Sequence, residues 1–431
     1  MTFQFEKSLE GFDSRYNIFS AKPVNTATKQ ELFIDFRPLN QIGPNQIIEF
    51  NAPNTSLYYT DLSRTKLQLK VRILKEDLTP IDGDCAVGLI NNTLHSLFRQ
   101  VDVSLQQQNI SPEIGFCYPY KAIIDTLCNH TSSELDSKYG TEMFYKDTAG
   151  YMDSTDTAGV SNTGLVKRWG FTSEGKNCVL DGVLKIDCFG IENYIINGVN
   201  LNVKLHPAKN SFILMSNDIE NYVIDITDAT LRVCYIQPSN ALIVGHSEAL
   251  ERSPAIYPFN KSTLKSFTVP SGLQNWSIDS LFSDNIPSVL YIVMVTSDSF
   301  NGDQKKNPFN FQHFNLDFLC LYIEGTPVNQ QAFLPNFEKD HFTNEYLSLF
   351  ENSKDTEIGN IIRYSDYKNG YTIYKINIAD GMQHDYVSLG RRGQTRLTMR
   401  FANSLKTPIT VVCYGQFPHF LQIDKARNII V

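Results

Sequence analysis

The clearest hint of catalytic chemistry in the sequence is a serine among small residues. Ser247 lies in the string Gly-His-Ser-Glu-Ala, directly after the apolar run Leu242-Ile243-Val244. Such a serine can act as a nucleophile when it lies on the sharp turn between a strand and a helix of an α/β sheet. Because both flanks of this string have the pattern of β-proteins, we expect a linker between domains instead. A short capped helix should begin near Ser247.

The spacing of the residues that could hold a metal or a nucleotide favours neither. The eight histidines are scattered, and neither His-x-His nor His-Glu-x-x-His occurs. None of the eight cysteines forms a Cys-x-x-Cys pair, and most lie in apolar strings, which predicts buried free thiols. No phosphate-binding loop and no dinucleotide-binding glycine motif is present. The sequence therefore predicts no metal, no cofactor, no catalytic site and a protein that is not an enzyme.

Two clusters could contact nucleic acid or a neighbouring subunit. Arg391 and Arg392 begin the densest basic cluster, although a solvated turn and strand face explains it more simply. Three phenylalanines in residues 307–314 could stack on a single strand, but we expect them to close the base of a β-sandwich. The chain has 38 Lys and Arg against 46 Asp and Glu, a net charge of −8. It should not coat a nucleic acid by itself, because phosphate binding needs a positive surface.

The elements that must position these residues are mostly β-strands. In residues 65–73 every second residue is apolar, which is the pattern of a strand with one buried face. Apolar residues at helical spacing predict helices only at 118–128 and 341–351. The other predicted strands are residues 46–50, 101–105, 183–188, 201–205, 229–236, 265–269, 288–296, 316–323, 371–378, 395–401 and 409–414.

The order of the predicted elements occurs twice. Each half has a strand, a helix, a loop and two more strands, and this repeat predicts an all-β protein of two tandem eight-stranded jelly-roll β-sandwiches with a few short helices. A long polar loop at 132–177 should project from the first sandwich. The predicted divisions are an N-terminal arm at 1–30, a first jelly roll at 31–238, a linker at 239–257, a second jelly roll at 258–421 and a C-terminal arm at 422–431.

Neither a secretion signal nor a membrane span is expected. The N-terminal residues have no basic segment followed by an apolar stretch. The longest apolar run, around residues 289–295, is far shorter than the about 20 residues that a membrane helix needs.

Several strings, in order from about residue 35 to the C-terminus, are shared with a known family. They include His95-Ser96-Leu97-Phe98-Arg99, Phe144-Tyr145-Lys146-Asp147, Asn307-Pro308-Phe309-Asn310-Phe311, Asn369-Gly370-Tyr371-Thr372 and Ile423-Asp424-Lys425. Through these strings the chain resembles the double jelly-roll major capsid proteins of Polinton (Maverick) elements and their adintovirus relatives. The first 30 residues match poorly.

The resemblance implies a hexon-like major capsid protein. Homotrimers with a pseudo-hexagonal outline would build an icosahedral shell around double-stranded DNA, which they would bind without sequence specificity. The implied partners are neighbouring capsomers and a single-jelly-roll penton protein. The implied location is the virion capsid, assembled inside the host cell in nucleus or cytoplasm, and a membrane partner is left open. The candidate contacts between subunits are Phe144, Tyr145, Lys146, Asp147, Arg391 and Arg392, with the loop at 132–177 as a clasp or outer tower.

Other functions stay open at this point. A β-sandwich that binds receptors or carbohydrates would carry exposed aromatic residues on its loops, and a hydrolase would use Ser247. A third alternative keeps the family but not the role, with a gene that a host has domesticated.

Overall fold

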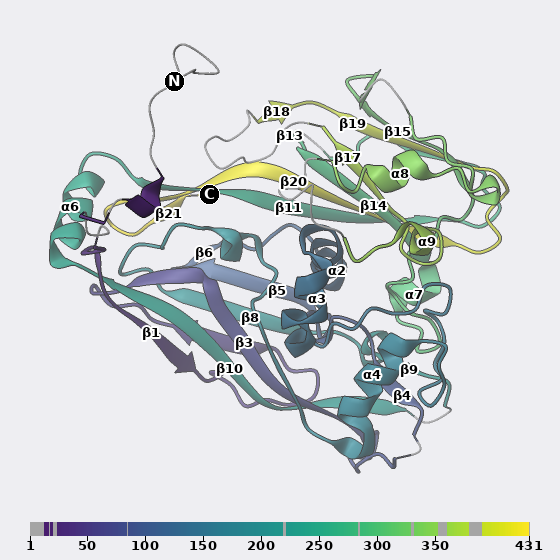
Figure 1. Cartoon of the computed structure of the whole chain (residues 1–431), viewed down its shortest axis with the longest axis horizontal. Coiled ribbons are helices and arrows are strands. Elements are labelled where there is room, and N and C mark those ends of the chain that lie inside the picture. Colours follow the sequence, from purple (N-terminus) through teal and green to yellow (C-terminus); the bar gives the residue numbers. More distant parts are fainter. Residues whose placement is uncertain are drawn as a thin grey trace.

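Two β-sandwiches follow each other along the chain (Figure 1). The computed structural model describes residues 13–16, 18–19, 24–83, 85–218, 221–282, 285–328, 332–351, 360–378 and 390–430. The first sandwich, with its insertions and the helix that follows it, comprises η1 (Ser14–Tyr16), β1 (Thr28–Phe36), β2 (Ile48–Ala52), β3 (Tyr59–Lys75), β4 (Val87–Leu89), α1 (Thr93–Ser96), β5 (Phe98–Leu105), β6 (Gln108–Asn109), α2 (Tyr118–Asn129), α3 (Ser132–Asp136), η2 (Lys138–Glu142), α4 (Thr163–Thr172), η3 (Ser173–Gly175), β7 (Cys178–Gly182), η4 (Asp187–Gly190), β8 (Leu201–Pro207), α5 (Asn210–Ile213), β9 (Leu214–Ser216), β10 (Tyr222–Pro238) and α6 (Asn240–Leu250). The second sandwich comprises β11 (Ala255–Val269), β12 (Asn275–Ile278), β13 (Asn285–Ile286), β14 (Val289–Thr296), α7 (Ser297–Asn301), β15 (Leu316–Ile323), β16 (Thr326–Pro327), η6 (Phe337–Lys339), α8 (Thr343–Leu347), α9 (Tyr364–Tyr367), β17 (Ile373–Asn377), β18 (Arg391–Arg392), β19 (Thr395–Phe401), β20 (Ile409–Ile423) and β21 (Ile429–Ile430).

The two sandwiches have the same strand order. In the first, a sheet of order β1-β10-β3-β7 faces one of order β2-β8-β5-β6. In the second, the corresponding sheets are β11-β20-β14-β17, with β21 added to β20, and β12-β19-β15-β16. Each strand of these two sheets in the first sandwich thus has its counterpart at the same place in the second. Eight strands in this arrangement form a jelly roll, so the predicted fold class of two tandem eight-stranded jelly rolls is confirmed.

Side-chain alternation explains why these segments are strands. On β3, Leu67, Leu69, Val71 and Ile73 are buried in the first jelly roll, while the intervening residues are half-buried or exposed, as the pattern in 65–73 predicts. On β14 every residue from 290 to 295 is buried. A strand with apolar residues on both faces is typical of a sheet that is covered on both sides.

Several predicted elements differ from the structure. Residues 183–188 do not form a strand, because β7 ends at Gly182 and a 3-10 helix begins at Asp187, whose carboxylate bonds to the second jelly roll. The helix predicted near Ser247 begins earlier, at Asn240, since the hydroxyl of Ser239 caps it. The helix expected at 341–351 is shorter, covering Thr343–Leu347.

Residues 132–177 are not a projecting loop, and this prediction was wrong. They contain α3, η2, α4 and η3, and they bury Leu135, Phe144 and Leu165. Polar residues that suggested a loop in fact begin helices: Thr131 forms a capping box with Glu134, and an asparagine caps α4. Composition alone could not distinguish caps and buried hydrogen bonds from solvated loop positions.

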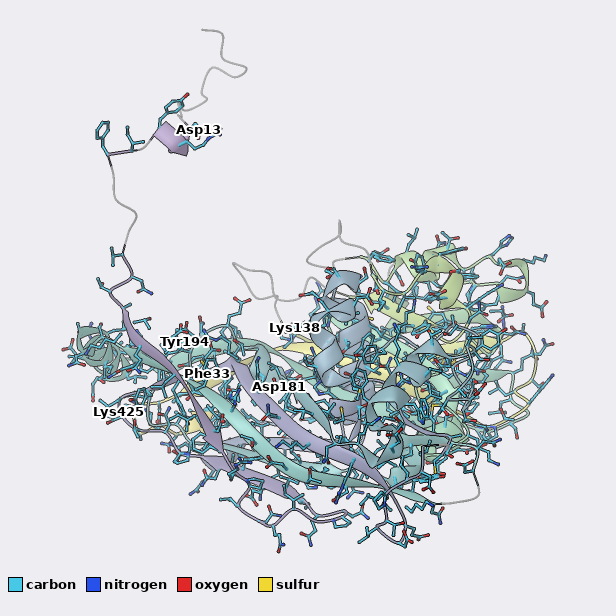
Figure 2. All side chains as sticks on the ribbon, turned by 60° about the horizontal axis from the view of Figure 1, so that its bottom comes forward. Asp13, Phe33, Lys138, Asp181, Tyr194 and Lys425 are labelled. Atoms are coloured by element: carbon cyan, nitrogen blue, oxygen red, sulfur yellow. The ribbon has the colours of Figure 1, made fainter. Side chains whose placement is uncertain are left out.

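All eight cysteines are free, and all but Cys85 are buried, as the sequence predicts. In the part of the chain that the structure describes, none of the helices has the length and apolar character needed to cross a bilayer. The described part of the N-terminal segment leads away from the body, with Asp13 standing clear of it (Figure 2).

Candidate functional site

The most elaborate site in the molecule is the seam where the first jelly roll covers the second. One face of the β11-β20-β14-β17 sheet lies against α2 and the residues around it (Figure 1). Tyr291 of β14 and Tyr414 of β20 stack on this face with ring centroids 5.5 Å apart, and the Tyr414 hydroxyl donates to Asp125 Oδ1 at 2.9 Å. The backbone of Glu113 pairs with β11, accepting from Leu264 N at 2.9 Å. Main chain and side chains therefore both join the two jelly rolls.

A buried lysine lies at the centre of the seam. Lys121 of α2 is 3% exposed, and its Nζ lies 2.7 Å from Asp125 Oδ2 and 3.2 Å from Asp187 Oδ1. Asp187 in turn accepts from the backbone N–H and the hydroxyl of Ser262 on β11, each at 2.7 Å. Burial alone would lower the pKa of Lys121, but the two carboxylates hold it well above its ordinary value. The ammonium is therefore charged. Its two carboxylate partners lie in the first jelly roll, and they in turn accept hydrogen bonds from Tyr414 and Ser262 of the second.

Aromatic rings form a second part of the seam. Tyr120 of α2 stacks on Phe300 at 5.3 Å between centroids and meets Phe309 edge-on at 5.8 Å. Phe309 also contacts Phe212 of α5 at 6.2 Å. The phenylalanines of 307–314 were predicted to close the base of a sandwich. Phe309 and Phe311 are buried against Tyr120 of the first jelly roll, and Phe314 is half-buried.

A buried ion pair forms the third part. Arg168 of α4 donates to Asp147 Oδ1 at 2.7 Å, and neither side chain is more than 1% exposed. Asn307 Nδ2 donates to Asp147 Oδ2 at 3.0 Å, and the Tyr371 hydroxyl donates to the Asp147 carbonyl oxygen at 2.7 Å. Arg168 is further held by the Leu89 carbonyl oxygen at 2.7 Å. Asp147 thus connects α4 of the first jelly roll to two segments of the second, through its carboxylate to Asn307 and through its carbonyl oxygen to Tyr371.

The structure places the predicted contact residues 144–147 together at this seam. Phe144 is buried, and Tyr145 N donates to Asn91 Oδ1 at 2.9 Å. Lys146 Nζ lies 2.5 Å from Asp366 Oδ2 in the second jelly roll. These contacts are within one chain, so a role between subunits stays a prediction for these residues.

Arg391 and Arg392 are not part of the seam contacts. They form the two-residue strand β18, which pairs with β13, and both are exposed. Of the same basic cluster, Arg396 lies 3.2 Å from Asp279 and Arg400 lies 2.8 Å from Asp317. This cluster is a solvated strand face.

Sequence reasoning missed a polar cluster inside the first jelly roll. His95 Nε2 lies 3.0 Å from Glu142 Oε2, and its Nδ1 lies 2.9 Å from the Tyr118 hydroxyl. Lys185 Nζ lies 3.1 Å from His130 Nε2, and burial and this ammonium lower the pKa of His130 to about 4. The members are scattered along the chain, so no local spacing marks them. The seam lysine did carry a signal, since Lys121 and Asp125 are four residues apart on an otherwise apolar helix.

Ser247 does not lie on the turn that the hydrolase alternative requires. It lies within α6, where its hydroxyl donates to the Ile243 carbonyl oxygen at 2.9 Å. The neighbouring His246 accepts or donates at Nδ1 with the Tyr59 hydroxyl at 2.8 Å, not with Ser247. Among the described residues, no group of three or more His, Cys, Asp or Glu side chains could hold a metal ion.

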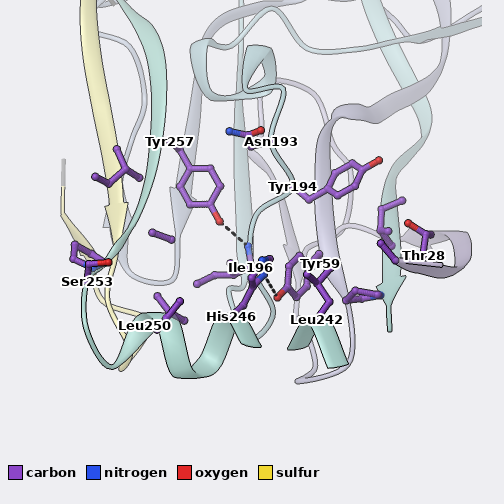
Figure 3. A pocket seen from close by; sticks show the side chains of 17 residues that line it. Thr28, Tyr59, Asn193, Tyr194, Ile196, Leu242, His246, Leu250, Ser253 and Tyr257 are labelled. Carbon is purple, nitrogen blue, oxygen red and sulfur yellow. Dashed lines mark hydrogen bonds between the residues drawn. The ribbon is translucent and has the colours of Figure 1, made fainter. Parts of the chain in front are cut away.

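A cavity of about 400 Å³ lies beside α6, and the starts of β1 and β11 line it (Figure 3). Its walls are mostly apolar and aromatic. The Tyr59–His246 bond crosses its base, and the Tyr257 hydroxyl accepts from Ile196 N at 3.1 Å (Figure 3).

Comparison with known proteins shows the fold. No family model matches the chain. The uncharacterized protein F54H12.2 of Caenorhabditis elegans is 24% identical over 406 residues, which cover 89% of this chain and 92% of that protein. A chain of the Sputnik virophage structure has a TM-score of 0.64 at 13% identity, over 98% of this chain and 92% of its own.

Two solved capsid proteins are also similar. The mavirus major capsid protein has a TM-score of 0.56 at 11% identity, over 100% of this chain and 96% of its own. The Faustovirus major capsid protein has a TM-score of 0.59 at 8% identity, over 96% of this chain and 93% of its own. The chain therefore has the double jelly-roll fold of viral major capsid proteins over nearly its whole length. The narrower assignment to Polinton elements stays a prediction.

Proposed function

We propose that this chain is the major capsid protein of a virus-like DNA element. In this proposal homotrimers with a pseudo-hexagonal outline build an icosahedral shell around double-stranded DNA. The observation that carries the proposal is the repeated strand order of the two jelly rolls, with a likeness to viral capsid structures that spans 98% of the chain. Since fold alone does not fix function, the proposal needs a direct test.

The seam supports a role in which the chain acts as one block. Two sandwiches joined by a flexible linker could move independently, as domains with small interfaces do. Here two buried hydrogen bonds cross between the jelly rolls, one from Ser262 to Asp187, the partner of Lys121, and one from Asn307 to Asp147. A shell subunit needs a fixed angle between its halves, because neighbours must meet the same surfaces in every copy.

Repetition within the chain supports the trimer. Three copies of a chain with two similar jelly rolls would present six similar flanks, which suits hexagonal packing. Each interface of an obligate oligomer often buries about 2,000 Å² or more in all. The broad flanks of a jelly roll suit an interface of this size. We propose Arg391, Arg392 and the exposed parts of Tyr145 and Lys146 as contacts between subunits, and the arms at 1–30 and 422–431 as contacts between capsomers.

Contacts at the C-terminal end limit what that arm can do. β21 pairs with β20, and Arg427 Nε donates to the Asn197 carbonyl oxygen at 2.7 Å. The described part of this arm is therefore bound to its own chain, and only its outer surface is open to a neighbour.

Charge supports a shell that encloses DNA without coating it. The net charge of −8 leaves no excess of positive side chains. DNA inside such a shell would be held without sequence-specific contacts, and a separate penton protein would close the vertices.

The experiment is expression of the full chain, mass measurement and negative-stain imaging. We expect particles of three times 49.0 kDa with a hexagonal outline, and shells at high concentration. A strict monomer at high concentration would contradict the proposal. The double variant Arg391→Ser with Arg392→Ser should weaken the trimer, whereas Arg396→Ser, in the same cluster but paired with Asp279, is the matched control.

A further inference from the structure

The helix between the jelly rolls is unusually apolar for its exposure. Along α6, Leu250 is buried, Leu242 and Ile243 are half-buried, and Val244 is 57% exposed. The helix stands at the edge of the molecule, at the end where the N- and C-terminal segments also lie (Figure 1). An apolar helix that buries so little of its surface within its own chain is typical of a site that a further partner covers.

A cavity opens next to this helix. Its volume of about 400 Å³ lies between α6, the residues just before β11 and the segment that carries Tyr194, whose side chain is 41% exposed. Figure 3 shows Tyr59, Tyr194 and Tyr257 around it, with Leu242 and Leu250 below. Walls of this kind, apolar with a few polar tips, suit an aromatic side chain.

The N-terminal segment carries side chains that need such a site. Tyr16, Ile18, Phe19 and Val24 are 77%, 76%, 96% and 81% exposed. The Asp13–Arg15 ion pair at 2.6 Å is local and does not attach this segment to the body. Apolar side chains left in water in this number mark a surface that is covered in the functional state.

We propose that the cavity beside α6 receives the N-terminal segment of a second copy of this chain, with the ring of Phe19 seated among Tyr59, Tyr194 and Leu242. This inference rests on the proposed function, because it names the contact that would connect copies in the assembly. It requires that the N-terminal segment extend away from the body of its own chain and that the cavity be open to a neighbouring copy.

Geometry favours a second copy over the same chain. Ala27 and Thr28 form one wall of the cavity, so the segment begins at the rim of the site. To enter the cavity of its own chain, Phe19 would have to fold back within the few residues that separate it from Ala27. Extended chain spans about 3.3 Å per residue, so Phe19 can reach roughly 30 Å from Thr28. That distance is enough to reach a neighbouring jelly roll.

The test is a disulfide between two chains that differ in mass. One chain carries Phe19→Cys, and the other, with an added tag, carries Asn193→Cys, since Asn193 is exposed at the cavity. Both chains also carry Cys85→Ser, because Cys85 is half-buried, whereas the other seven native thiols are buried and should not react. The control replaces Asn193→Cys by Val160→Cys, since Val160 is 89% exposed but does not line the cavity.

We expect a mixed disulfide of one chain of each mass, with at least a tenfold higher yield for Asn193→Cys than for Val160→Cys. Ala27→Trp, which fills the cavity, should lower this yield to that of the control. Equal yields for both partners, or a link only within single chains that carry both substitutions, would overturn the inference. If trimers and shells form without the link, the inference fails and the capsid proposal stands. If the chain stays monomeric at high concentration, the capsid proposal itself fails.

Discussion

The outer faces of two equivalent sheets differ in character although their strand order is the same. On the first jelly roll, the face of β1-β10-β3-β7 that points away from the core carries charged residues in alternating positions. On the second, the corresponding face of β11-β20-β14-β17 carries tyrosines and valines, and α2 covers it. Two sheets with the same strand order therefore differ in exposure: the outer face of the first is open to solvent, and that of the second is buried at the seam.

Ion pairs neutralise the open face. Basic residues of β3 and β10 meet acidic residues on β1, β7 and β10 across the strands. The pairs are Arg64–Glu31 at 2.8 Å, Lys66–Asp181 at 3.9 Å, Lys70–Asp228 at 3.6 Å, Arg72–Asp225 at 2.8 Å and Arg232–Asp35 at 2.8 Å. Exposed pairs of this kind add little stability, about 0–1 kcal/mol each. Their effect is to keep a broad sheet face polar and to discourage unspecific association.

The comparison shows that covering, not topology, decides the sequence of each strand. One face of β3 lies against water and the other against the core, so polar and apolar residues alternate along it. β14 has a core on one side and a helix on the other, so apolar residues run through it. At the centre of the seam the buried charge of Lys121 is paired with two carboxylates.

The largest expected effect comes from breaking that pairing. Lys121→Met would leave Asp125 and Asp187 without their buried counter-charge, which costs about 3–5 kcal/mol of unfolding free energy. Lys70→Met on the open face is the matched control and should cost about 0–1 kcal/mol. Urea unfolding of both variants would measure the difference. Equal losses would mean that the two faces do not differ as their burial indicates.

Acidification should next distinguish the open face from the buried polar cluster inside the first jelly roll. Burial lowers the pKa of His95, and burial with Lys185 lowers that of His130 from 6.5 to about 4. Such histidines take up protons mainly in the unfolded chain, so the stability they contribute is complete above pH 6.5 and is lost as the pH falls toward 4. We expect a loss of up to about 3 kcal/mol over this window. Arg232 lowers the pKa of Asp35 on the open face, and that contribution is lost only below about pH 4.

Urea unfolding between about pH 7.5 and about pH 4.5 would measure how the unfolding free energy depends on pH while these histidines titrate. His130→Gln keeps a neutral hydrogen-bonding side chain beside Lys185 and should flatten it. His341→Gln, at an exposed position, is the control and should behave as the unchanged chain does. An unchanged slope in His130→Gln would exclude His130 as its source.

A single hydroxyl at the seam should have a smaller effect. Tyr414→Phe removes the donor to Asp125 and the acceptor of Gln416, whose Nε2 lies 2.8 Å away. Leaving buried polar groups without a partner costs about 1–3 kcal/mol. Tyr194→Phe, on an exposed side chain, is the control and should be near neutral. A neutral Tyr414→Phe would show that water replaces the lost hydroxyl at the seam.

Local pattern predicted much of this fold and little of the seam. The strands at 316–323 and 395–401 match β15 and β19, because alternation depends only on neighbours along the chain. The strand predicted at residues 183–188 does not form, because Asp187 is held by Ser262, 75 positions further along the chain. The Asp147–Asn307 bond spans 160 positions, and no spacing in the sequence reveals such a partner.

The smallest expected effect lies on the open face itself. Asp225→Asn removes the charged partner of Arg72 while keeping the size of the side chain. We expect a loss of about 0–1 kcal/mol of unfolding free energy. This loss should shrink in about 1 M salt, because salt screens exposed charges. Lys121→Met should keep its loss in the same salt, since a buried pair is screened much less. Urea unfolding at low and high salt would compare the two. If both losses shrink alike, water and ions reach the seam, and the distinction between a sealed face and an open one would have to be abandoned.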